Sequence, residues 1–362
     1  MKVLIYGAGA IGCYIGGRLA NVGHSVTLIL RQTSAELIMR DGLFLNEGRE
    51  RLRTHPNAVT SLRQALLDGA TYDVVFLCMK SYDIDKTMDE IAAFYPNIPL
   101  MITMQNGVGT EEKLVKEYGA ERVIAGTITT PISIDGSNSF TIERSDRGIG
   151  LAPMLKKGQD IRPWVDMLNE AGINTIREKD YRSLKWSKMV LNLLGNSTSA
   201  ILNRHPRTLY KHNVTYNLEI DMVEEALQVM HKSGIKVIDL PGTPAAKLAF
   251  SVEKLPRGLY KPLLARIVGE ARGEKMPSFQ IDLSRGRERN EVIYHNGAVV
   301  KQGAEVGVPT PVNTVLTETL LRLVRKEEDW QQYNGRPELL INKIKQYRAE
   351  SRGKSKLPAD LS

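Results

Sequence analysis

The chain has 362 residues, 42% of them hydrophobic and 25% charged, which predicts a globular protein of two domains rather than a disordered or fibrous one. Its formal net charge of +8 owes much to late segments, and without interleaved aromatic and basic residues it does not predict a nucleic-acid surface. No apolar run is long enough to cross a bilayer, and two cysteines, Cys13 and Cys78, provide neither a disulfide framework nor a metal site.

The N-terminal residues enter an apolar run at once, and Lys2–Tyr6 are predicted to form the first strand. The run stops at Gly7, is shorter than a leader and is followed by no cleavage site of small residues, so we do not interpret it as a signal peptide. Together with the scarcity of cysteine, this predicts a protein of the reducing cytoplasm without a membrane partner.

A glycine-rich segment, Gly7-Ala8-Gly9-Ala10-Ile11-Gly12, follows this strand and opens a helix that we expect to end near Val22. Gly23 and His24 then lead into a second strand, which completes a βαβ unit and makes the pattern more specific than glycines alone. The first glycine suits a tight turn, the second a close approach of the backbone to a pyrophosphate, and the third close packing of helix on strand. Candidate cofactor-binding residues here are Gly7, Gly9, Ala10, Ile11 and Gly12.

The end of the second strand, Leu28-Ile29-Leu30-Arg31-Gln32, favours NADP over NAD. An NAD site places an acidic residue there for the ribose 2′-hydroxyl, whereas a 2′-phosphate needs a cation, and this chain has no acid before Glu36. Arg31 can make a forked contact to that phosphate. Lys80 follows the predicted strand Asp73–Met79 at the same edge of the sheet and is a second candidate, although either cation could be an ordinary surface charge.

Short β-branched runs alternate with amphipathic stretches in the first half of the chain, whereas long helical patterns take over after Asp180. We therefore expect an α/β protein with an N-terminal Rossmann-type doubly wound sheet over residues 1–180 and an all-helical C-terminal domain over residues 181–330. Residues 331–362 are expected to form an extension that frays from Glu350 on, and Leu240–Met276 stays unassigned. Further predicted strands are Ser25–Leu30, Leu100–Met104, Arg122–Ala125, Phe140–Arg144, Gly148–Ala152 and Ile173–Arg177, and predicted helices are Arg182–Leu202, Asn217–Ser233, Asn290–Val306 and Val312–Lys326.

The predicted helix from Arg182 carries three polar residues on an otherwise apolar surface. At roughly 100° per residue, Lys188, Asn192 and Asn196 lie within about 80° of one another. Such a stripe could face solvent, or it could line a cleft that holds a polar ligand, because buried polar groups need partners. We favour the cleft because the stripe is so narrow.

Several separated motifs add to this pattern, and their order and approximate spacing resemble the ketopantoate reductase (2-dehydropantoate 2-reductase) family. The resemblance covers about Met1 to Lys326. Ser197, Phe279 and Ile293 depart from the residues usual in that family, near the positions expected to hold the tail of the substrate. The motifs are the glycine turn, Gln105-Asn106-Gly107-Val108-Gly109, Trp186-Ser187-Lys188 with Asn192, Asn196 and Thr198, Ser278 with Asp282, Arg285-Gly286-Arg287, Asn290-Glu291, Tyr294 with Asn296-Gly297, and Val308-Pro309-Thr310-Pro311.

The resemblance implies roles for individual residues. Lys188 looks like the catalytic lysine, and Asn106 looks like the residue near the nicotinamide and the substrate. Hydride that arrives at a keto carbon builds negative charge on the oxygen, which a positioned ammonium can stabilise and protonate. The resemblance further implies that Asn192 and Asn196 line the substrate site and that Ser278 binds the substrate carboxylate. Glu291 would contact the substrate hydroxyl or hold Lys188, and no metal is implied.

The function implied is NADPH-dependent reduction of ketopantoate to pantoate, on the route to pantothenate and coenzyme A. The alternatives are a reductase of another branched or larger 2-keto acid, an opine-type dehydrogenase with the same two-domain plan, and a non-catalytic NADP(H)-sensing protein. The presence of Lys188 argues against the sensor. The expected partner is a small-molecule 2-keto acid, without nucleic acid or membrane, and assembly into a homodimer is left open.

Overall fold

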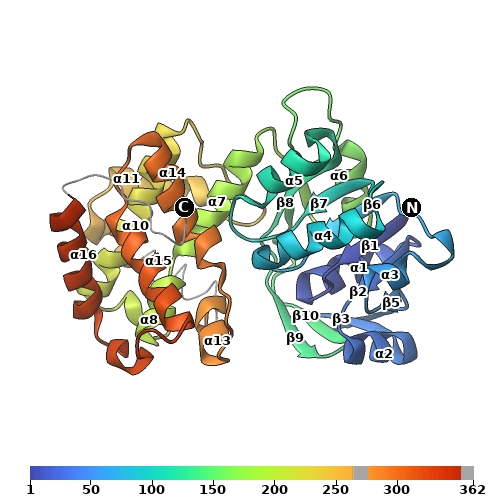
Figure 1. Ribbon diagram of the computed structural model, residues 1–362, viewed down its shortest axis with the longest axis horizontal. Helices are drawn as coiled ribbons and strands as arrows, with labels where there is room; N and C mark the ends of the chain where they lie inside the picture. Colours follow the sequence, from blue (N-terminus) through green and yellow to red (C-terminus); the bar gives the residue numbers. More distant parts are fainter. Residues whose placement is uncertain (263, 265–275, 352–362) are drawn as a thin grey trace. The chain divides into compact units, whose positions relative to one another are not determined.

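The computed structural model describes residues 1–262, 264 and 276–351, and the chain divides into two compact units (Figure 1). The N-terminal unit comprises Met1–Lys185 and Leu240–Thr243, and the C-terminal unit comprises Trp186–Asp239 and Pro244–Ser362. The boundary falls inside helix α7 (Tyr181–Leu193), whose first residues belong to one unit and whose remainder belongs to the other.

An eight-stranded sheet in the order β12-β11-β8-β7-β6-β1-β2-β5 organises the N-terminal unit. The six neighbouring strands β8, β7, β6, β1, β2 and β5 are parallel. The chain adds strands on one side of β1 first and then, from β6 on, on the other side. Sheets of this kind bind ligands in the crevice at such a reversal, here outside the carboxyl ends of β1 and β6. β11 runs antiparallel to β8 and pairs in parallel with β12. The strands are β1 (Lys2–Tyr6), β2 (Ser25–Ile29), β5 (Asn57–Val59), β6 (Val74–Leu77), β7 (Leu100–Thr103), β8 (Val123–Ile128), β11 (Ile149–Pro153) and β12 (Thr175–Arg177).

Side chains of the central strands alternate between two hydrophobic cores. Val3 and Ile5 join the core on one face of the sheet, whereas Leu4 and Tyr6 join the core on the other. Because successive strand residues point to opposite faces, both faces must be covered, and the predicted doubly wound fold is confirmed. The covering helices are α1 (Ala10–Asn21), α2 (Gln32–Asp41), α3 (Leu62–Ala65), α4 (Ile84–Phe94), α5 (Thr110–Tyr118) and α6 (Arg162–Glu170), with short 3₁₀ turns η1 (Leu67–Gly69), η2 (Ser81–Asp83) and η3 (Ala120–Arg122).

A second sheet of four strands, in the order β4-β3-β10-β9, lies beside α2 in Figure 1. Of its strands only β10 was predicted from the sequence, because β4 is rich in charged residues and β3 has an apolar run of only three residues. The sheet packs on α1 at Gly17, where an added Cβ would lie 2.9 Å from the side chains of Leu43 and Leu45. Its strands are β3 (Leu43–Glu47), β4 (Glu50–Thr54), β9 (Ile132–Gly136) and β10 (Ser139–Ile142).

Four residues from the previously unassigned stretch, Leu240–Thr243, return to the N-terminal unit. The backbones of Leu240 and Thr243 bond to each other in both directions, at 3.0 and 2.8 Å. The Thr129 hydroxyl donates to the carbonyl of Pro241 at 2.7 Å, and Gly242 adopts a φ of +62°. We call Leu240–Thr243 the return segment.

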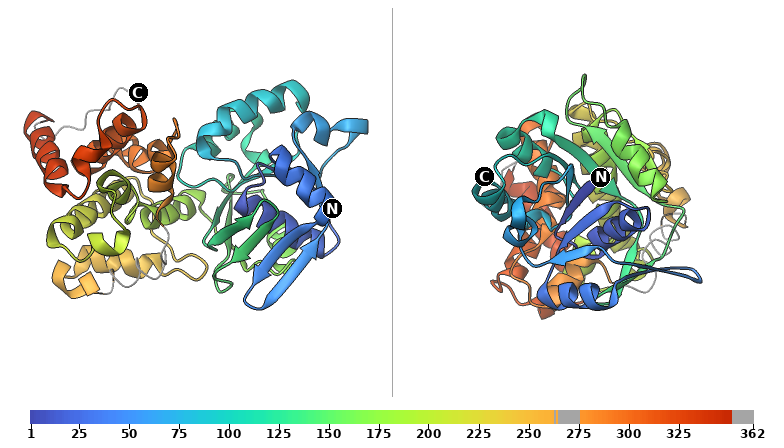
Figure 2. Two further views of the ribbon diagram at one scale, coloured as in Figure 1. Left: turned by 90° about the horizontal axis from the view of Figure 1, so that it is seen from below. Right: turned by 90° about the vertical axis from the view of Figure 1, so that its right-hand side faces the viewer.

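Helices build the C-terminal unit, which Figure 2 shows from two further sides in colours from yellow-green to red. The two long helices α10 and α15 are buried over most of their residues, as expected for the centre of a helical domain. The helical prediction for this part of the chain is confirmed. The elements after α7 are α8 (Ser197–Leu202), α9 (Pro206–Leu209), α10 (Asn213–Lys232), α11 (Ala245–Lys254), α13 (Ser278–Ser284), η4 (Glu291–Tyr294), α14 (Asn296–Val306), α15 (Pro311–Val324), η5 (Trp330–Tyr333) and α16 (Pro337–Ser351).

Two predicted helices are wrong as continuous elements. The helix predicted over Arg182–Leu202 ends at Leu193, because Gly195 adopts a φ of +60° and its N–H donates to the buried Glu219 carboxylate at 2.6 Å. The helix predicted over Asn290–Val306 is a 3₁₀ turn followed by α14, with a break at His295, whose φ and ψ are −114° and −96°.

The extension predicted after residue 330 packs on the C-terminal unit as far as it is described. The Gly335 N–H donates to the Leu202 carbonyl at 2.9 Å, and Leu340 and Ile344 of α16 are buried. Just before the extension, the Trp330 indole donates to the carbonyls of Ala200 and Ile201, at 2.9 and 3.1 Å. Residues 352–362, where fraying is expected, and residues 265–275 lie outside the described residues. None of the described helices is long and apolar enough to cross a membrane.

Candidate functional site

The glycine turn lies at the carboxyl end of β1, beside β6. Gly7 adopts a φ of +81°, and a Cβ there would lie 2.6 Å from the backbone nitrogen of Met79. A Cβ on Gly12 would lie 2.8 Å from the side chain of Ile5, so helix α1 crosses β1 closely. Gly9 is exposed, and apart from its chain neighbours no atom of the described residues lies within 4 Å of its Cβ position. The structure thus has the tight turn at Gly7, the open space at Gly9 and the close packing of helix on strand at Gly12, as expected from the sequence.

Helix α1 begins directly after Gly9, and no side chain caps its N-terminus. Ala10 and Ile11 occupy its first turn and are half-buried. The backbone of Ala8 donates to the Ile29 carbonyl at 2.8 Å, which ties the turn to β2. The first N–H groups of this helix therefore lie at the ligand-binding edge of the sheet, with the positive end of the helix dipole.

The two predicted phosphate-binding cations lie at the carboxyl ends of β2 and β6, the two strands that flank β1. Arg31 follows β2, is exposed and precedes helix α2, whose first turn contains no acidic residue. Lys80 follows β6, is half-buried and precedes the 3₁₀ turn η2. The charge at this edge therefore suits an anion better than a ribose hydroxyl.

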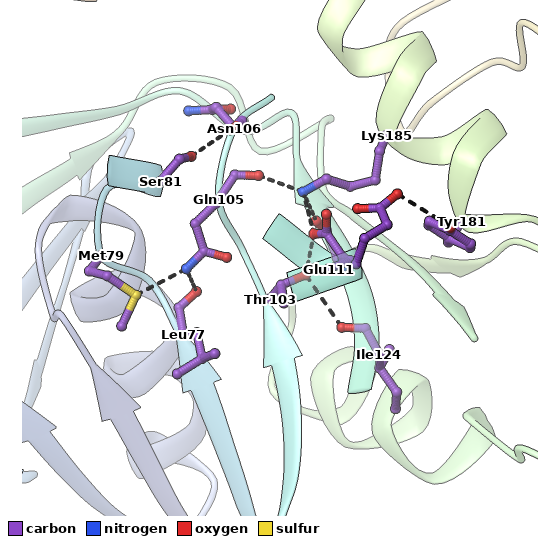
Figure 3. Close-up of polar contacts among 12 residues, drawn as sticks. Leu77, Met79, Ser81, Thr103, Gln105, Asn106, Glu111, Ile124, Tyr181 and Lys185 are labelled. Atoms are coloured by element: carbon purple, nitrogen blue, oxygen red, sulfur yellow. Dashed lines mark hydrogen bonds and ion pairs between the residues drawn. The ribbon is translucent and has the colours of Figure 1, made fainter. Parts of the chain in front are cut away.

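Asn106 lies in the loop between β7 and α5, and its neighbours are held by buried contacts (Figure 3). The Gln105 amide donates to the Leu77 carbonyl at 2.9 Å and to the sulfur of Met79 at 3.1 Å. The Ser81 hydroxyl, fully buried, donates to the Asn106 carbonyl at 2.8 Å. The loop is thereby bonded to the segment that follows β6.

A buried ion pair holds the same loop from the other side. The Lys185 ammonium lies 2.8 Å from the Glu111 carboxylate, and their side chains are 3% and 1% exposed. The ammonium also donates to the carbonyls of Gln105, at 2.6 Å, and Gly126, at 3.2 Å (Figure 3). The Thr103 hydroxyl donates to Glu111 at 2.6 Å. All three N–H bonds of the ammonium therefore have acceptors.

In the C-terminal unit, Lys188 and Asn192 lie four residues apart on α7, on one side of the helix, and both are half-buried. Asn196 does not continue this stripe: it lies beyond the end of α7 as the N-terminal flanking residue of α8, and it is buried. The three-residue stripe predicted from helical periodicity is therefore wrong, because Gly195 breaks the helix.

Asn196 instead joins a second group of predicted residues. Its side-chain oxygen accepts the backbone N–H of Phe279 at 3.4 Å, and Ser278, the first residue of α13, is exposed beside that contact. The Phe279 ring packs edge-on against His295, with centroids 5.1 Å apart. His295 closes the turn η4, at whose start Glu291 lies, 3% exposed. The C-terminal unit therefore brings together the segments of three of its predicted substrate residues.

A buried polar network fixes the helices behind this group. The Ser197 hydroxyl donates to Asn296, whose amide donates to Asn313 at 3.0 Å. The backbone and side chain of Asn313 donate to the Glu225 carboxylate at 2.9 and 2.8 Å, and Val312 adds a third bond at 2.8 Å. Burial raises the pKa of Glu225 to about 7 in spite of these donors.

Sequence reasoning missed the residues that hold the Asn106 loop, namely Ser81, Glu111 and Lys185. A lysine between Leu184 and Trp186, both buried, is a signal that could have drawn attention to position 185. Its partner could not have been found in the same way, because Glu111 is one of two acidic residues in the first turn of an ordinary amphipathic helix.

Comparison with known proteins bears directly on this arrangement. Residues 3–150 match the family model described as ketopantoate reductase PanE/ApbA, and residues 180–324 match its C-terminal counterpart. The 2-dehydropantoate 2-reductase of Pyrococcus horikoshii is 29% identical over 318 residues, which cover 87% of this chain and 95% of that protein. The protein of the same name from Mesorhizobium japonicum is 26% identical and covers 90% and 97% of the two chains.

Solved structures agree with these sequence relatives. A PanE/ApbA family ketopantoate reductase from Ralstonia eutropha has a TM-score of 0.73 and 26% identity, and covers 91% of this chain and 100% of that one. D-mandelate dehydrogenase with NADH and anilino(oxo)acetate shares the fold, with a TM-score of 0.73 at 22% identity and coverage of 90% and 99%. The chain therefore belongs to the ketopantoate reductase family of NAD(P)-dependent enzymes and is an oxidoreductase that reduces keto acids.

Proposed function

We propose that this protein reduces ketopantoate to pantoate with NADPH, and that Lys188 is the general acid. The observation that carries the choice of substrate is that relatives matching nearly their whole length, from Pyrococcus to Mesorhizobium, are named 2-dehydropantoate 2-reductase. Fold alone would not decide it, since D-mandelate dehydrogenase has the same fold.

The glycine turn fits a dinucleotide. Gly9 leaves open space where a side chain would block a pyrophosphate, and the N–H groups of the first turn of α1, at Ala10 and Ile11, would hold the phosphates. Arg31 and Lys80 would bind the 2′-phosphate, and Arg31 supports NADPH because it is exposed and no carboxylate lies in the turn after it. When bound, the reduced nicotinamide supplies the hydride that the keto carbon receives.

Lys188 would act at the keto oxygen. Negative charge develops on this oxygen as the carbonyl is reduced, and an ammonium beside it stabilises that charge and donates a proton from Nζ. Asn192, one turn further along α7, would donate to the substrate from the same side of the helix. Asn106 would orient the reacting carbonyl from its loop.

The remaining polar residues would hold the ends of the substrate. Ser278 is exposed beside the Asn196–Phe279 contact, and the hydroxyl of Ser278 and the amides of Asn192 and Asn196 can donate to a carboxylate. Glu291 can accept the hydroxyl that ketopantoate carries and a plain 2-keto acid lacks. A site built around such a bond rejects the analogue without it by several orders of magnitude.

The test compares ketopantoate with its deoxy analogue, 2-keto-3,3-dimethylbutanoate, by following NADPH oxidation. We expect a strong preference for ketopantoate in the unmodified protein that largely collapses in Glu291→Ala. Glu288→Ala, which removes an exposed carboxylate three residues earlier, is the matched control and should keep the preference. Equal turnover of the two compounds by the unmodified protein would contradict the choice of substrate and leave the keto acid reductase in place.

A further inference from the structure

We propose that Lys185 is a positioning residue of the reductase site, which fixes the backbone of Asn106 through the carbonyl of Gln105. This inference rests on the proposed function, in which Asn106 orients the reacting carbonyl. Lys185 itself has no access to a substrate, since its side chain is 3% exposed and its three N–H bonds end on acceptors within the protein.

The loop needs such a constraint. Gly107 and Gly109 follow Asn106 with φ values of +84° and +104°, and glycines leave a loop free to adopt many conformations. The two peptide groups that flank the Cα of Asn106 are both held by side chains: Lys185 binds the Gln105 carbonyl at 2.6 Å, and Ser81 binds the Asn106 carbonyl at 2.8 Å. Rotation about either backbone bond of Asn106 would break one of these contacts (Figure 3).

Stability alone does not account for the charge at this position. Bringing two charges out of water is costly, and apolar residues of similar size often replace a buried ion pair without loss of stability. An apolar side chain could fill the space of Lys185, but it could not bond the carbonyls of Gln105 and Gly126. The Glu111 carboxylate offsets part of the cost of burying the Lys185 ammonium. The ionised form of Glu111 is in turn favoured because the residue lies in the first turn of α5, at the positive end of the helix dipole.

The decisive variant replaces both members of the pair, because removing one would leave a buried charge without a partner. Lys185→Met with Glu111→Gln keeps the volume of both side chains and removes the bond to Gln105. Lys113→Met is the matched control: it is an exposed lysine of α5 that pairs with Asp85 at 2.8 Å. Glu111→Gln alone keeps the ammonium and its bonds to the two carbonyls, so its kcat should fall less than that of the double variant.

Each protein is assayed with NADPH and the 2-keto acid that the unmodified protein reduces fastest. We expect the double variant to lower kcat by roughly ten- to a hundred-fold, since small misplacements of reacting groups have effects of this size. The primary isotope effect with NADPH deuterated at the transferred position should rise, because hydride transfer becomes the slow step. Affinity for 2′,5′-ADP, which probes only the adenine half of the cofactor, should stay unchanged. Lys113→Met should match the unmodified protein in all three measurements.

Unchanged kcat and isotope effect in the folded double variant would overturn the proposal, and so would a loss of kcat that merely follows the folded fraction. If the double variant does not fold, Ser81→Ala decides, because it removes the other bond to the loop with a small change of volume. We then expect a lower kcat with a higher isotope effect, and full activity would overturn the proposal. No turnover of any 2-keto acid by the unmodified protein would overturn the proposed function together with this inference.

Discussion

Two glycine turns, Gly7 in the N-terminal unit and Gly195 in the C-terminal unit, are specified in different ways. Gly7 is required by the backbone around it, since a side chain there would meet Met79 at 2.6 Å. Gly195 has a φ of +60°, and its N–H is bound by the fully buried carboxylate of Glu219, which is 24 residues away in the sequence. The first turn depends on the close approach of the backbone that follows β6, and the second on a polar side chain from another helix.

This difference extends to the site residues of each unit. Parallel strands bring their carboxyl ends to one edge, so Gly7, Arg31, Lys80 and Asn106 are placed by topology. Helices have no such common edge, and the segments of Asn196, Ser278 and Glu291 meet through particular side-chain contacts. Changes at the glycine turn should therefore act through backbone shape, and changes where the segments of the C-terminal unit meet should act through buried polar groups.

The largest effect is expected for Lys188→Ala. The protein should fold, because this side chain is half-buried on a helix, and kcat should fall by about 10²–10⁴-fold, which is the usual contribution of a general acid. Binding of NADPH should change little, because the proposed phosphate contacts belong to the other unit. Steady-state kinetics and fluorescence titration measure both, and Lys301→Ala, an exposed lysine of α14, is the control. More than about a tenth of the activity left in the variant would exclude this role.

The next effect concerns the stability of the C-terminal unit against pH. Burial raises the pKa of Glu225 to about 7, above the ordinary value of 4.5, and the N–H donors of Asn313 and Val312 offset this only in part. The folded state thus retains a proton that the unfolded chain releases. The contribution of protonated Glu225 to the free energy of unfolding is therefore fully present below pH 4.5 and is lost as the pH rises to 7. At about 1.4 kcal/mol per pH unit, the loss amounts to roughly 3 kcal/mol.

Urea unfolding between pH 4.5 and 8 checks this. The unfolding free energy of the unmodified protein should fall with pH more steeply than that of Glu225→Gln, although the variant is less stable overall because an amide cannot accept all three N–H bonds. Glu224→Gln, on the same helix and paired with Arg257 near the surface, should keep the original slope. Parallel slopes for Glu225→Gln and the unmodified protein would show that this carboxyl is ionised like an exposed one.

A pair of glycine variants sharpens the comparison in the N-terminal unit. Gly7→Ala should lower the unfolding free energy by roughly 2 kcal/mol or more, because the left-handed backbone and the close Met79 backbone both oppose a Cβ. Gly9→Ala should leave stability nearly unchanged, since its Cβ would enter open space, but should weaken NADPH binding. Thermal unfolding measures the stability of each variant, and NADPH titration measures its cofactor affinity. Equal stability and equal affinity of the two variants would contradict a structural role for Gly7 and a binding role for Gly9.

The smallest effect is expected for Arg31→Asp, which should discriminate between cofactors. Losing a forked bond to a phosphate, worth roughly 1.5–3 kcal/mol, should lower kcat/KM for NADPH by about ten- to a hundred-fold. NADH, which lacks the 2′-phosphate, should be affected little or favoured. Arg63→Asp, an exposed arginine of α3, is the control. Equal kcat/KM for NADPH and NADH in the unmodified protein would contradict the proposal that Arg31 selects the cofactor.

The sequence predicted the main sheet and the glycine turn well, because each leaves a pattern that can be recognised along the chain. β6 is a short apolar run, and the spacing of Gly7, Gly9 and Gly12 has a direct steric meaning. β3 and β4 were missed, since the apolar run of β3 is only three residues long and β4 has a single apolar residue among charged ones.

The helical unit was harder to predict, because its breaks and contacts depend on residues that are far apart in the sequence. Helical periodicity placed Asn196 on a stripe with Lys188, and the bond from Gly195 to Glu219, which ends that helix, joins segments that are distant in sequence. The same holds for one pair of the N-terminal unit, since Lys185 looks like a surface charge until its partner Glu111 is known. Pattern and propensity describe neighbours along the chain, and buried polar partners are a property of the folded molecule.

The return segment, Leu240–Thr243, has a consequence for the order in which the protein is made. A ribosome delivers the chain from its N-terminus, so all eight strands of the main sheet emerge before any of the return segment. Thr129 receives its acceptor, the carbonyl of Pro241, only after residues 186–239 have been synthesised. The sheet unit is thus the first to be translated and among the last to be completed. A nascent chain released at residue 185 would leave the ribosome without the segment that Thr129, just after β8, contacts.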